Sequence, residues 1–409
     1  MKVTPRPRIS VIVPTYNRCG LLRQTLESLA GQRFPIDEFE VIVSDDGSSD
    51  ASATVVHSFS GRLRLRYCFQ EDQGFRVAAA RNAGARLAAS PILAFLDSGT
   101  LAGPDYVRGH LDSHPAQAQR RVVVGYCFGY RLTDQSSGLT EALEELLPAQ
   151  VVQRYGNDPS FTDLRHQVFE QVGFDLDRLS APWCLLWTMN CSVEAEAFRL
   201  VGGFDETFRS WGGEDFELGY RLSQVGQQFV VSREAWSIEV PIQRNLRAIR
   251  QSSKRNSLRI LRKHCEPVME LFCAADLRDE TFLIESDSAA LWSWEREAAD
   301  LEVRTELEEA VADLPAGASV TIFGCGAAVP SSIAAATLLD FDSRLLARAL
   351  ADGRHTGYQL IGLRTPLRTG STDVVIITSR LSGLWDRWGT QVLAEAHRIG
   401  RQVRRPWLA

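Results

Sequence analysis

The first hundred residues alternate between short apolar runs and longer amphipathic stretches, and this alternation limits the fold more than any other feature. Continuous apolar runs rich in β-branched residues, at positions 9–14, 39–46 and 91–97, predict buried strands. Helical patterns at 21–30, 52–59 and 76–89 separate these runs. Strands that alternate with helices indicate an α/β fold around a parallel sheet.

Polar residues stand at or just past the ends of these three strands. They are Thr15, Tyr16, Asn17 and Arg18 in the first case, Asp45, Asp46, Gly47 and Ser48 in the second, and Asp97, Ser98 and Gly99 in the third. Ligands of parallel α/β sheets bind at the carboxyl ends of the strands. The sequence therefore predicts that three loops converge on one crevice.

Composition excludes several classes of protein. A net charge of -6 on 409 residues gives no reason to expect nucleic acid as a partner. The eight cysteines form no CxxC pair, so we expect reduced thiols and a cytoplasmic location. No apolar run approaches the roughly 18 residues of a membrane span, so we expect none.

Five segments carry a family resemblance: VIVPTYNR, VSDDGSSD, QGFRVAAARNAG, FLDSG and NCSVEAEAFRLVGGFDETFRSWGGEDFELGYRL. In this order, over about residues 8–240, they resemble the family 2 glycosyltransferases, and the last segment resembles the galactosyltransferase-type C-terminal motif. The resemblance implies a GT-A-type, Rossmann-like mixed sheet flanked by helices. It also implies transfer of a sugar from a nucleotide-sugar donor.

The resemblance assigns the nucleotide side of the donor to the first two loops. Asp45 resembles the aspartate that contacts the base, with Asp46 beside it, since a carboxylate can accept hydrogen bonds from a base N–H or a ribose hydroxyl. The loop expected to close over the ring consists of Pro14, Thr15, Tyr16 and Asn17. The second interpretation is a plain turn in which Asp50 or Ser49 caps the next helix, and both interpretations can hold together.

Three further residues are expected to contact the donor. Arg81 belongs to the RN motif of the family, and Arg81 and Arg76 could pair with phosphate oxygens through their forked guanidinium groups. The alternative is two solvated arginines on a helix face. Asn190 could face the sugar, or it could be a buried, hydrogen-bonded amide.

The segment SWGGEDFELGYRL holds the predicted catalytic base. By resemblance Asp215 takes the proton from the acceptor, and Glu214 holds a sugar hydroxyl. Gly212 and Gly213 allow the backbone to approach the sugar closely, and Trp211 could stack against the sugar or the acceptor. The alternative is an acidic pair that only stabilises the helix start.

The metal motif of the family, DxD, is incomplete here. Asp97 is present, with Ser98 after it, but Gly99 replaces the second carboxylate. Asp97 and Glu239 could still hold a weakly bound Mn²⁺ or Mg²⁺ with the diphosphate and water. Alternatively, Arg244 and Arg247 of a basic helix at 243–264 could supply the positive charge that the leaving diphosphate needs.

We expect three segments: a GT-A domain at 1–265, a helical linker at 266–316, and a smaller Rossmann-like domain at 317–409. The turn FGCGAAVP in the last segment has Val329 where a dinucleotide-binding motif has its third glycine. Asp340 and Asp342 could meet a ribose, but we favour a structural or assembly role, such as formation of a homo-oligomer.

The predicted function is inverting transfer of a hexose or N-acetylhexosamine from a nucleoside diphosphate sugar, with UDP the commonest nucleotide among such relatives. The acceptor nucleophile, a hydroxyl or another group, could belong to a peptide, a natural product or a glycan. The alternative is a non-catalytic protein that binds sugar nucleotides as a scaffold, which the incomplete DxD motif suggests.

Overall fold

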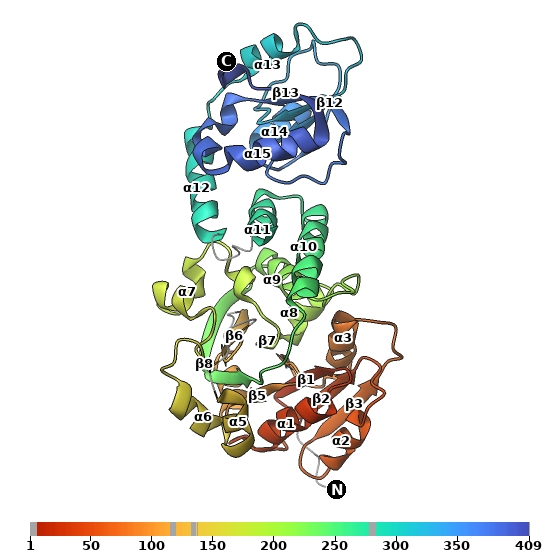
Figure 1. Cartoon of the computed structure of the whole chain (residues 1–409), viewed down its shortest axis with the longest axis vertical. Coiled ribbons are helices and arrows are strands. Elements are labelled where there is room, and N and C mark those ends of the chain that lie inside the picture. The colour runs from red at the N-terminus through yellow and green to blue at the C-terminus, as the bar shows by residue number, and fades with distance from the viewer. Residues whose placement is uncertain (1–5, 115–119, 132–135, 137, 278–283, 409) are drawn as a thin grey trace. The chain divides into compact units, whose positions relative to one another are not determined.

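The computed structural model describes residues 6–114, 120–131, 136, 138–277 and 284–408. The chain divides into two compact units, one up to Ser252 and one from Ser253 onward. Each unit is built around its own β-sheet (Figure 1). The break falls inside helix α10 (Leu246–Lys263), and the helices of the predicted linker at 266–316 belong to the second unit.

The sheet of the first unit has eight strands within the described residues, in the order β3-β2-β1-β4-β7-β6-β8-β5. Their bounds are β1 (Ile9–Thr15), β2 (Phe39–Asp45), β3 (Leu65–Phe69), β4 (Ile92–Leu96), β5 (Thr100–Ala102), β6 (Arg121–Phe128), β7 (Asn190–Glu194) and β8 (Gln228–Glu239). Strands β1 to β4 are parallel, and β7 is antiparallel to both β4 and β6. Strand β8 runs parallel to β6, so the carboxyl ends of β1, β2, β4, β6 and β8 share one edge. The prediction of an α/β fold with a mixed sheet is confirmed.

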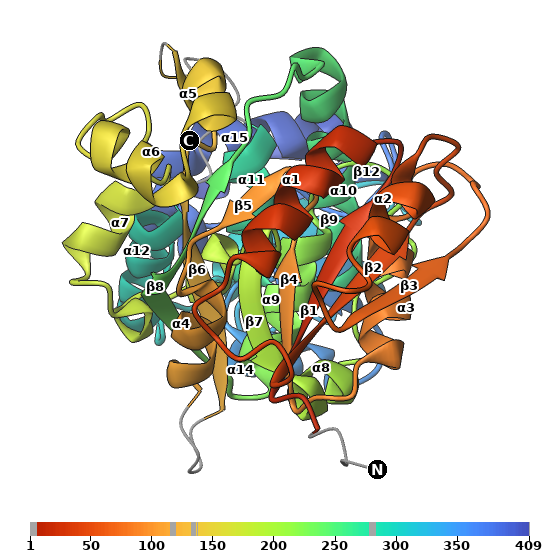
Figure 2. The same cartoon turned by 90° about the horizontal axis from the view of Figure 1, so that it is seen from below.

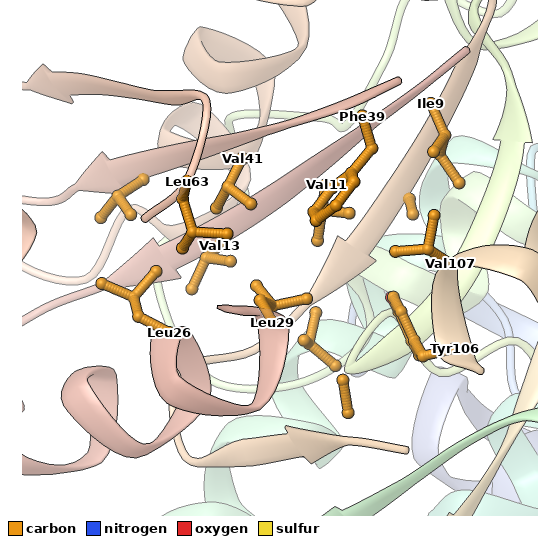
Figure 3. Close-up of a cluster of buried hydrophobic side chains, with 14 of the residues drawn as sticks. Ile9, Val11, Val13, Leu26, Leu29, Phe39, Val41, Leu63, Tyr106 and Val107 are labelled. Atoms are coloured by element: carbon orange, nitrogen blue, oxygen red, sulfur yellow. The ribbon is translucent and has the colours of Figure 1, made fainter. Parts of the chain in front are cut away.

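Helices cover both faces of this sheet. Their bounds are α1 (Cys19–Ala30), α2 (Ser52–Ser58), α3 (Val77–Leu87), α4 (Tyr106–Asp112), α8 (Ala195–Leu200) and α9 (Glu214–Gln224). Helix α1 lies against one face of the sheet (Figure 2). Alternate residues of β1 point to opposite faces, and Val11 and Val13 pack with Leu26 and Leu29 of α1 (Figure 3). On the other face α3 approaches closely, because a Cβ at Gly84 would lie 2.6 Å from Ile12.

An insertion between β6 and β7 contains α5 (Leu139–Glu145), α6 (Pro148–Tyr155) and α7 (His166–Gln171) and the short helices η1 (Leu176–Arg178) and η2 (Pro182–Leu185). A fully buried ion pair fixes it: Arg165 donates to Asp163 at 2.7 Å. Asp163 in turn accepts the N–H of Cys127 on β6 at 2.7 Å. The insertion is therefore tied to the strand whose carboxyl end reaches the shared edge.

The second unit has a parallel sheet in the order β11-β10-β9-β12-β13 within the described residues. Its strands are β9 (Val320–Phe323), β10 (Ala336–Leu339), β11 (Thr356–Tyr358), β12 (Thr372–Ile377) and β13 (Gly400–Arg404). Its helices are α11 (Pro267–Leu277), α12 (Ile284–Glu297), α13 (Arg304–Val311), α14 (Ser343–Leu350) and α15 (Trp385–Ile399), with short helices η4 (Ser379–Leu384) and η5 (Pro406–Leu408). This small Rossmann-like arrangement matches the fold class that the sequence predicts.

Buried Glu270 ties α11 to this second sheet. Its carboxylate accepts four consecutive backbone N–H groups, at 2.5–2.9 Å, from Ile361, Gly362, Leu363 and Arg364. Burial nevertheless raises the pKa of Glu270 to about 7. The first helix after α10 is thus held by the loop that follows β11.

Candidate active site

The loops after β1 and β2 are joined to one another at the shared edge. The backbone N–H of Asn17 donates to Ser48 Oγ at 2.7 Å, and Asn17 Oδ1 accepts the N–H of Ser49 at 2.8 Å. Asn17 adopts a positive φ of +49°, which asparagine tolerates better than most residues. Tyr16 is 43% exposed, and its hydroxyl donates to Asp72 at 2.8 Å. The segment from Pro14 to Asn17 therefore forms a fixed rim with one exposed aromatic ring.

Asp45 is buried and accepts three hydrogen bonds from neighbouring residues. One carboxylate oxygen accepts the N–H groups of Gly47 and Ser48, and the other accepts the hydroxyl of Tyr67 at 2.7 Å. Asp50 accepts the N–H of Ser52, the first residue of α2, at 2.9 Å and that of Cys19, the first residue of α1, at 2.8 Å. These contacts form the turn of the second interpretation, and the contact between Asp45 and a base stays a prediction.

Asp46 and Arg76 form a second engaged pair next to this turn. Asp46 accepts the side-chain amide of Gln70 at 2.6 Å and the backbone N–H of Arg76 at 2.7 Å. Burial raises the pKa of Asp46 above its ordinary value. The guanidinium Nε of Arg76 lies 3.5 Å from the same carboxylate, and its side chain is only 13% exposed. Arg76 is therefore not a solvated arginine on a helix face.

Arg81 joins two carboxylates from distant parts of the chain. Its guanidinium donates to Asp97, just after β4, at 2.8 Å and to Glu214, at the start of α9, at 3.0 Å. The side chain of Arg81 is 4% exposed, whereas that of Asp97 is 37% exposed. In this structure Arg81 therefore binds two acids of the site, whereas the sequence predicts a contact with phosphate.

Two glycines in left-handed conformations precede helix α9, Gly212 at a φ of +86° and Gly213 at +97°. A Cβ at Gly212 would meet no atom within 4 Å, so the backbone there borders open space. Trp211 before them is half-buried, and its carbonyl accepts a hydrogen bond from Ser252 Oγ at 2.7 Å. Only glycine adopts these φ values readily, which explains the local sequence.

The two acids that follow, Glu214 and Asp215, differ in burial and in their hydrogen-bond partners. Glu214 is 6% exposed, and its Oε2 atom has no hydrogen-bond partner within the described part of the chain, although Oε1 is paired with Arg81. Asp215 is half-buried. Burial and the neighbouring charge of Glu214 raise the pKa of Asp215 to about 7, while Arg81 opposes the shift. A carboxyl group with this pKa can accept a proton near neutral pH.

The residues expected to bind a divalent cation do not fit one. Asp97 is paired with Arg81, and Glu239 at the end of β8 is paired with Arg244. Gly99 has a φ of +95°, and a Cβ there would lie 3.3 Å from Leu21, so a second carboxylate would be strained. Across the described residues, no group of three or more histidines, cysteines or acids is arranged to hold a metal ion.

The pKa of Glu239 depends on its burial and on the neighbouring charges of the site. Burial raises its pKa to about 7, and the charge of Asp97 adds to this effect, whereas Arg244 and Arg18 oppose it. The backbone of Glu239 pairs with Thr100 of β5, directly after the Asp97–Gly99 turn. Ser98 in that turn is 8% exposed, and its N–H donates to the carbonyl of Pro14 at 3.4 Å. The ends of β1, β4 and β8 therefore meet.

Asn190 lies in the core between β7 and its neighbouring strands. Asn190 is fully buried, and its amide donates to the carbonyl of Ala235 and to Ser237 Oγ, both at 2.8 Å. Its oxygen lies 3.0 Å from Nε2 of buried His110. Burial lowers the pKa of His110 to about 3, so the ring is neutral and can serve this uncharged network. Asn190 is the buried amide of the alternative interpretation.

Tyr130 and Trp187 were missed by the sequence reasoning. Tyr130 follows β6, and the guanidinium carbon of Arg244 lies 5.1 Å from the centre of its ring. Burial raises the pKa of its phenol far above the ordinary range, and the charges of Glu239 and Asp215 act in the same direction. The ring of Trp187 lies 5.1 Å from that of Tyr130. Tyr130 lies just past the carboxyl end of β6, so the expectation that ligands bind at strand ends identifies it once β6 is included.

The acids of the second unit serve its own structure. Asp340 and Arg380 are buried, and Asp340 accepts two hydrogen bonds from Arg380, at 2.8 and 3.0 Å. The N–H groups of the glycine turn are also used internally, since Gly324 and Cys325 donate to the carbonyl of Leu339 and Gly326 donates to Asp340. Asp342 caps α14 through the N–H of Arg344. These contacts favour the structural interpretation of the unit.

Comparison with known proteins places this site in a class. A family model described as "Glycosyl transferase family 2" matches residues 10–154, and one described as "N-terminal domain of galactosyltransferase" matches residues 174–240. Validoxylamine A glucosyltransferase of Streptomyces hygroscopicus subsp. jinggangensis (strain 5008) is 43% identical over 98% of this chain and 97% of its own length. The enzyme of the same name from S. hygroscopicus subsp. limoneus is 43% identical over 98% of this chain and 91% of its own length.

A more distant relative is the hyaluronan synthase of Pasteurella multocida, 31% identical over 54% of this chain and 23% of its own length. The class is therefore clear: the protein is a glycosyltransferase, as the sequence predicts. The chain belongs to the family 2 glycosyltransferases. Among the residues that the structure describes, no helix has both the length and the apolar character needed to cross a bilayer.

Proposed function

We propose that this enzyme is an inverting glucosyltransferase that uses a nucleoside diphosphate glucose as donor and Asp215 as general base. The observation that carries the proposal is the pair of acids at the start of α9. Asp215 is half-buried with a pKa raised to about 7, and Glu214 beside it presents a buried oxygen without a partner in the described chain. A base poised near neutral pH and an unsatisfied acceptor atom are what sugar transfer to a hydroxyl requires.

The donor sugar is proposed from the relatives. Two proteins that match nearly the whole chain are glucosyltransferases, so we propose glucose as the transferred sugar. UDP is the nucleotide to test first. Both proteins are named for validoxylamine A, and we propose this natural product, or one similar to it, as the acceptor.

In the proposed reaction an acceptor hydroxyl oxygen attacks C1 of the glucose from the side opposite the diphosphate. The C1–O bond to the diphosphate breaks with its electron pair on the leaving oxygen, and Asp215 takes the hydroxyl proton. Oε2 of Glu214 accepts a hydrogen bond from a sugar hydroxyl, which satisfies its buried lone pairs. Gly212, before α9, leaves room for the sugar beside the backbone.

The exposed ring of Tyr16 and the joined loops after β1 and β2 lie on the proposed nucleotide side. Their hydrogen bonds fix this rim before the donor arrives, which reduces the entropy lost on binding. Asp45 supports the rim through Gly47 and Ser48.

The test is a transfer assay with validoxylamine A and a panel of UDP-, GDP- and dTDP-glucose, with UDP-galactose and UDP-N-acetylglucosamine as sugar controls. We expect a glucosylated product with one nucleotide strongly preferred. Binding of a donor with no turnover on this or related acceptors would support the scaffold alternative. Faster transfer of another sugar would overturn the choice of glucose.

A further inference from the structure

Two arginines neutralise the acids at which a metal ion would be expected, but the two pairs differ. Arg81 is 4% exposed and divides its guanidinium between Asp97 and Glu214. Arg244 is 12% exposed and forms an ion pair with Glu239, whose side chain is 14% exposed. Arg81 is thus fixed by two carboxylates, whereas Arg244 is held by one acid at the rim of the site.

Arg244 lies where the ends of several strands meet. It follows β8, whose last residue Glu239 pairs with Thr100 beside the Asp97–Gly99 turn. The ring of Tyr130 lies under its guanidinium, with the ring centre 5.1 Å away. The charges of Asp97 and Arg18 both act on Glu239, the partner of Arg244. Arg244 is therefore close to the proposed site of the leaving group.

A leaving diphosphate needs positive charge, whatever the source. The acids present do not fit a divalent cation, because Asp97 and Glu239 are each paired with an arginine and Gly99 supplies no carboxylate. The guanidinium group offers a planar fork of N–H donors that matches two phosphate oxygens, and it carries a permanent charge. Stacking on Tyr130 orients this fork without using its donors.

We propose that Arg244 binds the diphosphate of the donor in place of a divalent cation, and that Glu239 holds the guanidinium until the donor displaces it. The inference rests on the proposed function, because it assumes a nucleoside diphosphate donor. It assigns opposite roles to two neighbours: Arg244 strengthens donor binding, and Glu239 competes with the donor for the same guanidinium.

The experiment measures UDP binding by isothermal titration calorimetry, in EDTA and in Mn²⁺, with uridine as the ligand that lacks phosphate. We expect the UDP affinity of the wild type to be the same in both buffers within about twofold. Arg244→Ala should weaken UDP binding by about tenfold or more and leave uridine binding unchanged. Arg250→Ala, which removes an exposed arginine from α10, the helix that begins just after Arg244, is the matched control and should change neither affinity.

Glu239→Gln gives the sharper result. A Glu239 that competes for Arg244 and a Glu239 that binds a metal predict opposite changes in UDP affinity. If Glu239 competes for Arg244, its neutral variant should bind UDP several-fold more tightly in EDTA. If Glu239 is a metal ligand, the variant should bind UDP more weakly in Mn²⁺. Thermal unfolding of every variant, with Arg244→Lys as a charge-preserving replacement, verifies that the fold is intact.

Two outcomes overturn the inference while leaving the proposed function in place: UDP binding that requires Mn²⁺, or weaker binding by Glu239→Gln. Equal UDP affinity for Arg244→Ala and Arg250→Ala would also overturn it. If UDP, GDP and dTDP all fail to bind the wild type in either buffer, the proposed function itself fails and this inference fails with it.

Discussion

The guanidinium of Arg81 lies 2.8 Å from the carboxylate of Asp97 and closes the gap between the end of β4 and the start of α9. Its other terminal nitrogen donates to Glu214, so one buried cation serves two acids. The ring of Phe204 lies 5.3 Å from the same guanidinium carbon. Removing one partner of such a buried group leaves charges without compensation, which costs more than the loss of an exposed pair.

Replacing Arg81 should therefore destabilise the first unit. We expect Arg81→Met to lower the free energy of unfolding by about 3–5 kcal/mol, because Asp97 and Glu214 lose their shared cation. Urea unfolding followed by tryptophan fluorescence measures this change. The control is Arg86→Ala on the same helix, which removes a 67% exposed side chain 3.8 Å from Glu206 and should cost no more than about 1 kcal/mol. Equal losses for both variants would contradict the account.

Asp215→Asn should separate stability from activity. We expect sugar transfer to fall by about 10²–10⁴-fold, because the base is lost, while UDP affinity stays within about twofold. The folded-state pKa of Asp215 is raised from an ordinary value of 3.8 to about 7. At pH 8 the ionised carboxylate is therefore less stable in the folded state than in the unfolded state, which lowers the stability of the wild type. The asparagine variant should thus unfold at a higher temperature than the wild type at pH 8.

The size of that gain should depend on pH. As pH rises from about 4 to about 7, the wild type loses stability because its unfolded state ionises more readily than its folded state, whereas asparagine does not titrate. The difference in unfolding temperature should therefore grow through this window and level off above it. Calorimetry at several pH values checks this; a gain that is largest at acidic pH would show that burial of the Asp215 charge is not its cause.

The rate of transfer should rise with pH and reach a plateau above about 7. Asp215 must be ionised to accept a proton, and burial and Glu214 raise its pKa to about 7, while Arg81 opposes the shift. The measurement is kcat/KM as a function of pH. Glu239 also titrates near 7, so Glu239→Gln serves as the control and should keep the rising limb. A profile that is flat from about pH 5.5 to 8.5 would remove Asp215 from its proposed role.

Much of the first unit could be predicted from the sequence because strands β1, β2 and β4 are buried on both faces. The apolar runs at 9–14, 39–46 and 91–97 correspond to β1, β2 and β4 within two residues at each end. Burial on both faces leaves a continuous apolar run, which is visible without knowledge of neighbours. The helical patterns at 21–30, 52–59 and 76–89 likewise correspond to α1, α2 and α3.

The partners of the charged residues could not be predicted in the same way. Arg81 and Glu214 are 133 positions apart, and no local pattern reports a pairing over that distance. Asn190 stands at the start of a strand beside the site, and only its neighbours Ala235 and Ser237 show that its amide is consumed in the core. Motifs locate polar residues along the chain, whereas packing decides which of them remain available to a ligand.

Restoring the missing carboxylate should not restore a metal site. We expect Gly99→Asp to lose about 1–3 kcal/mol of stability, because the residue has a φ of +95° and its Cβ would press on Leu21. Asp97 would remain paired with Arg81. Titration with Mn²⁺ followed by electron paramagnetic resonance should show no gain in affinity over the wild type, with Gly74→Asp, at another positive φ but in open space, as the control. Tight, stoichiometric Mn²⁺ binding by Gly99→Asp would refute this.

The second unit should depend on the buried pair of Asp340 and Arg380. We expect Arg380→Met to lower the free energy of unfolding by about 3–5 kcal/mol, because the carboxylate of Asp340 stays buried without its cation. Arg344→Ala removes an arginine that is 74% exposed and should cost at most about 1 kcal/mol. Differential scanning calorimetry compares the two. Comparable stability for both variants would mean that the pair does not support the fold of this unit.

The configuration of the product tests the central claim most directly. Nuclear magnetic resonance can follow the anomeric proton during transfer from UDP-glucose to validoxylamine A by the wild type and by Asp215→Asn. The account predicts that the wild type forms a glucoside with the anomeric configuration opposite to that of the donor, and that Asp215→Asn forms almost none. Retention of the donor configuration, or undiminished product from the variant, would contradict it.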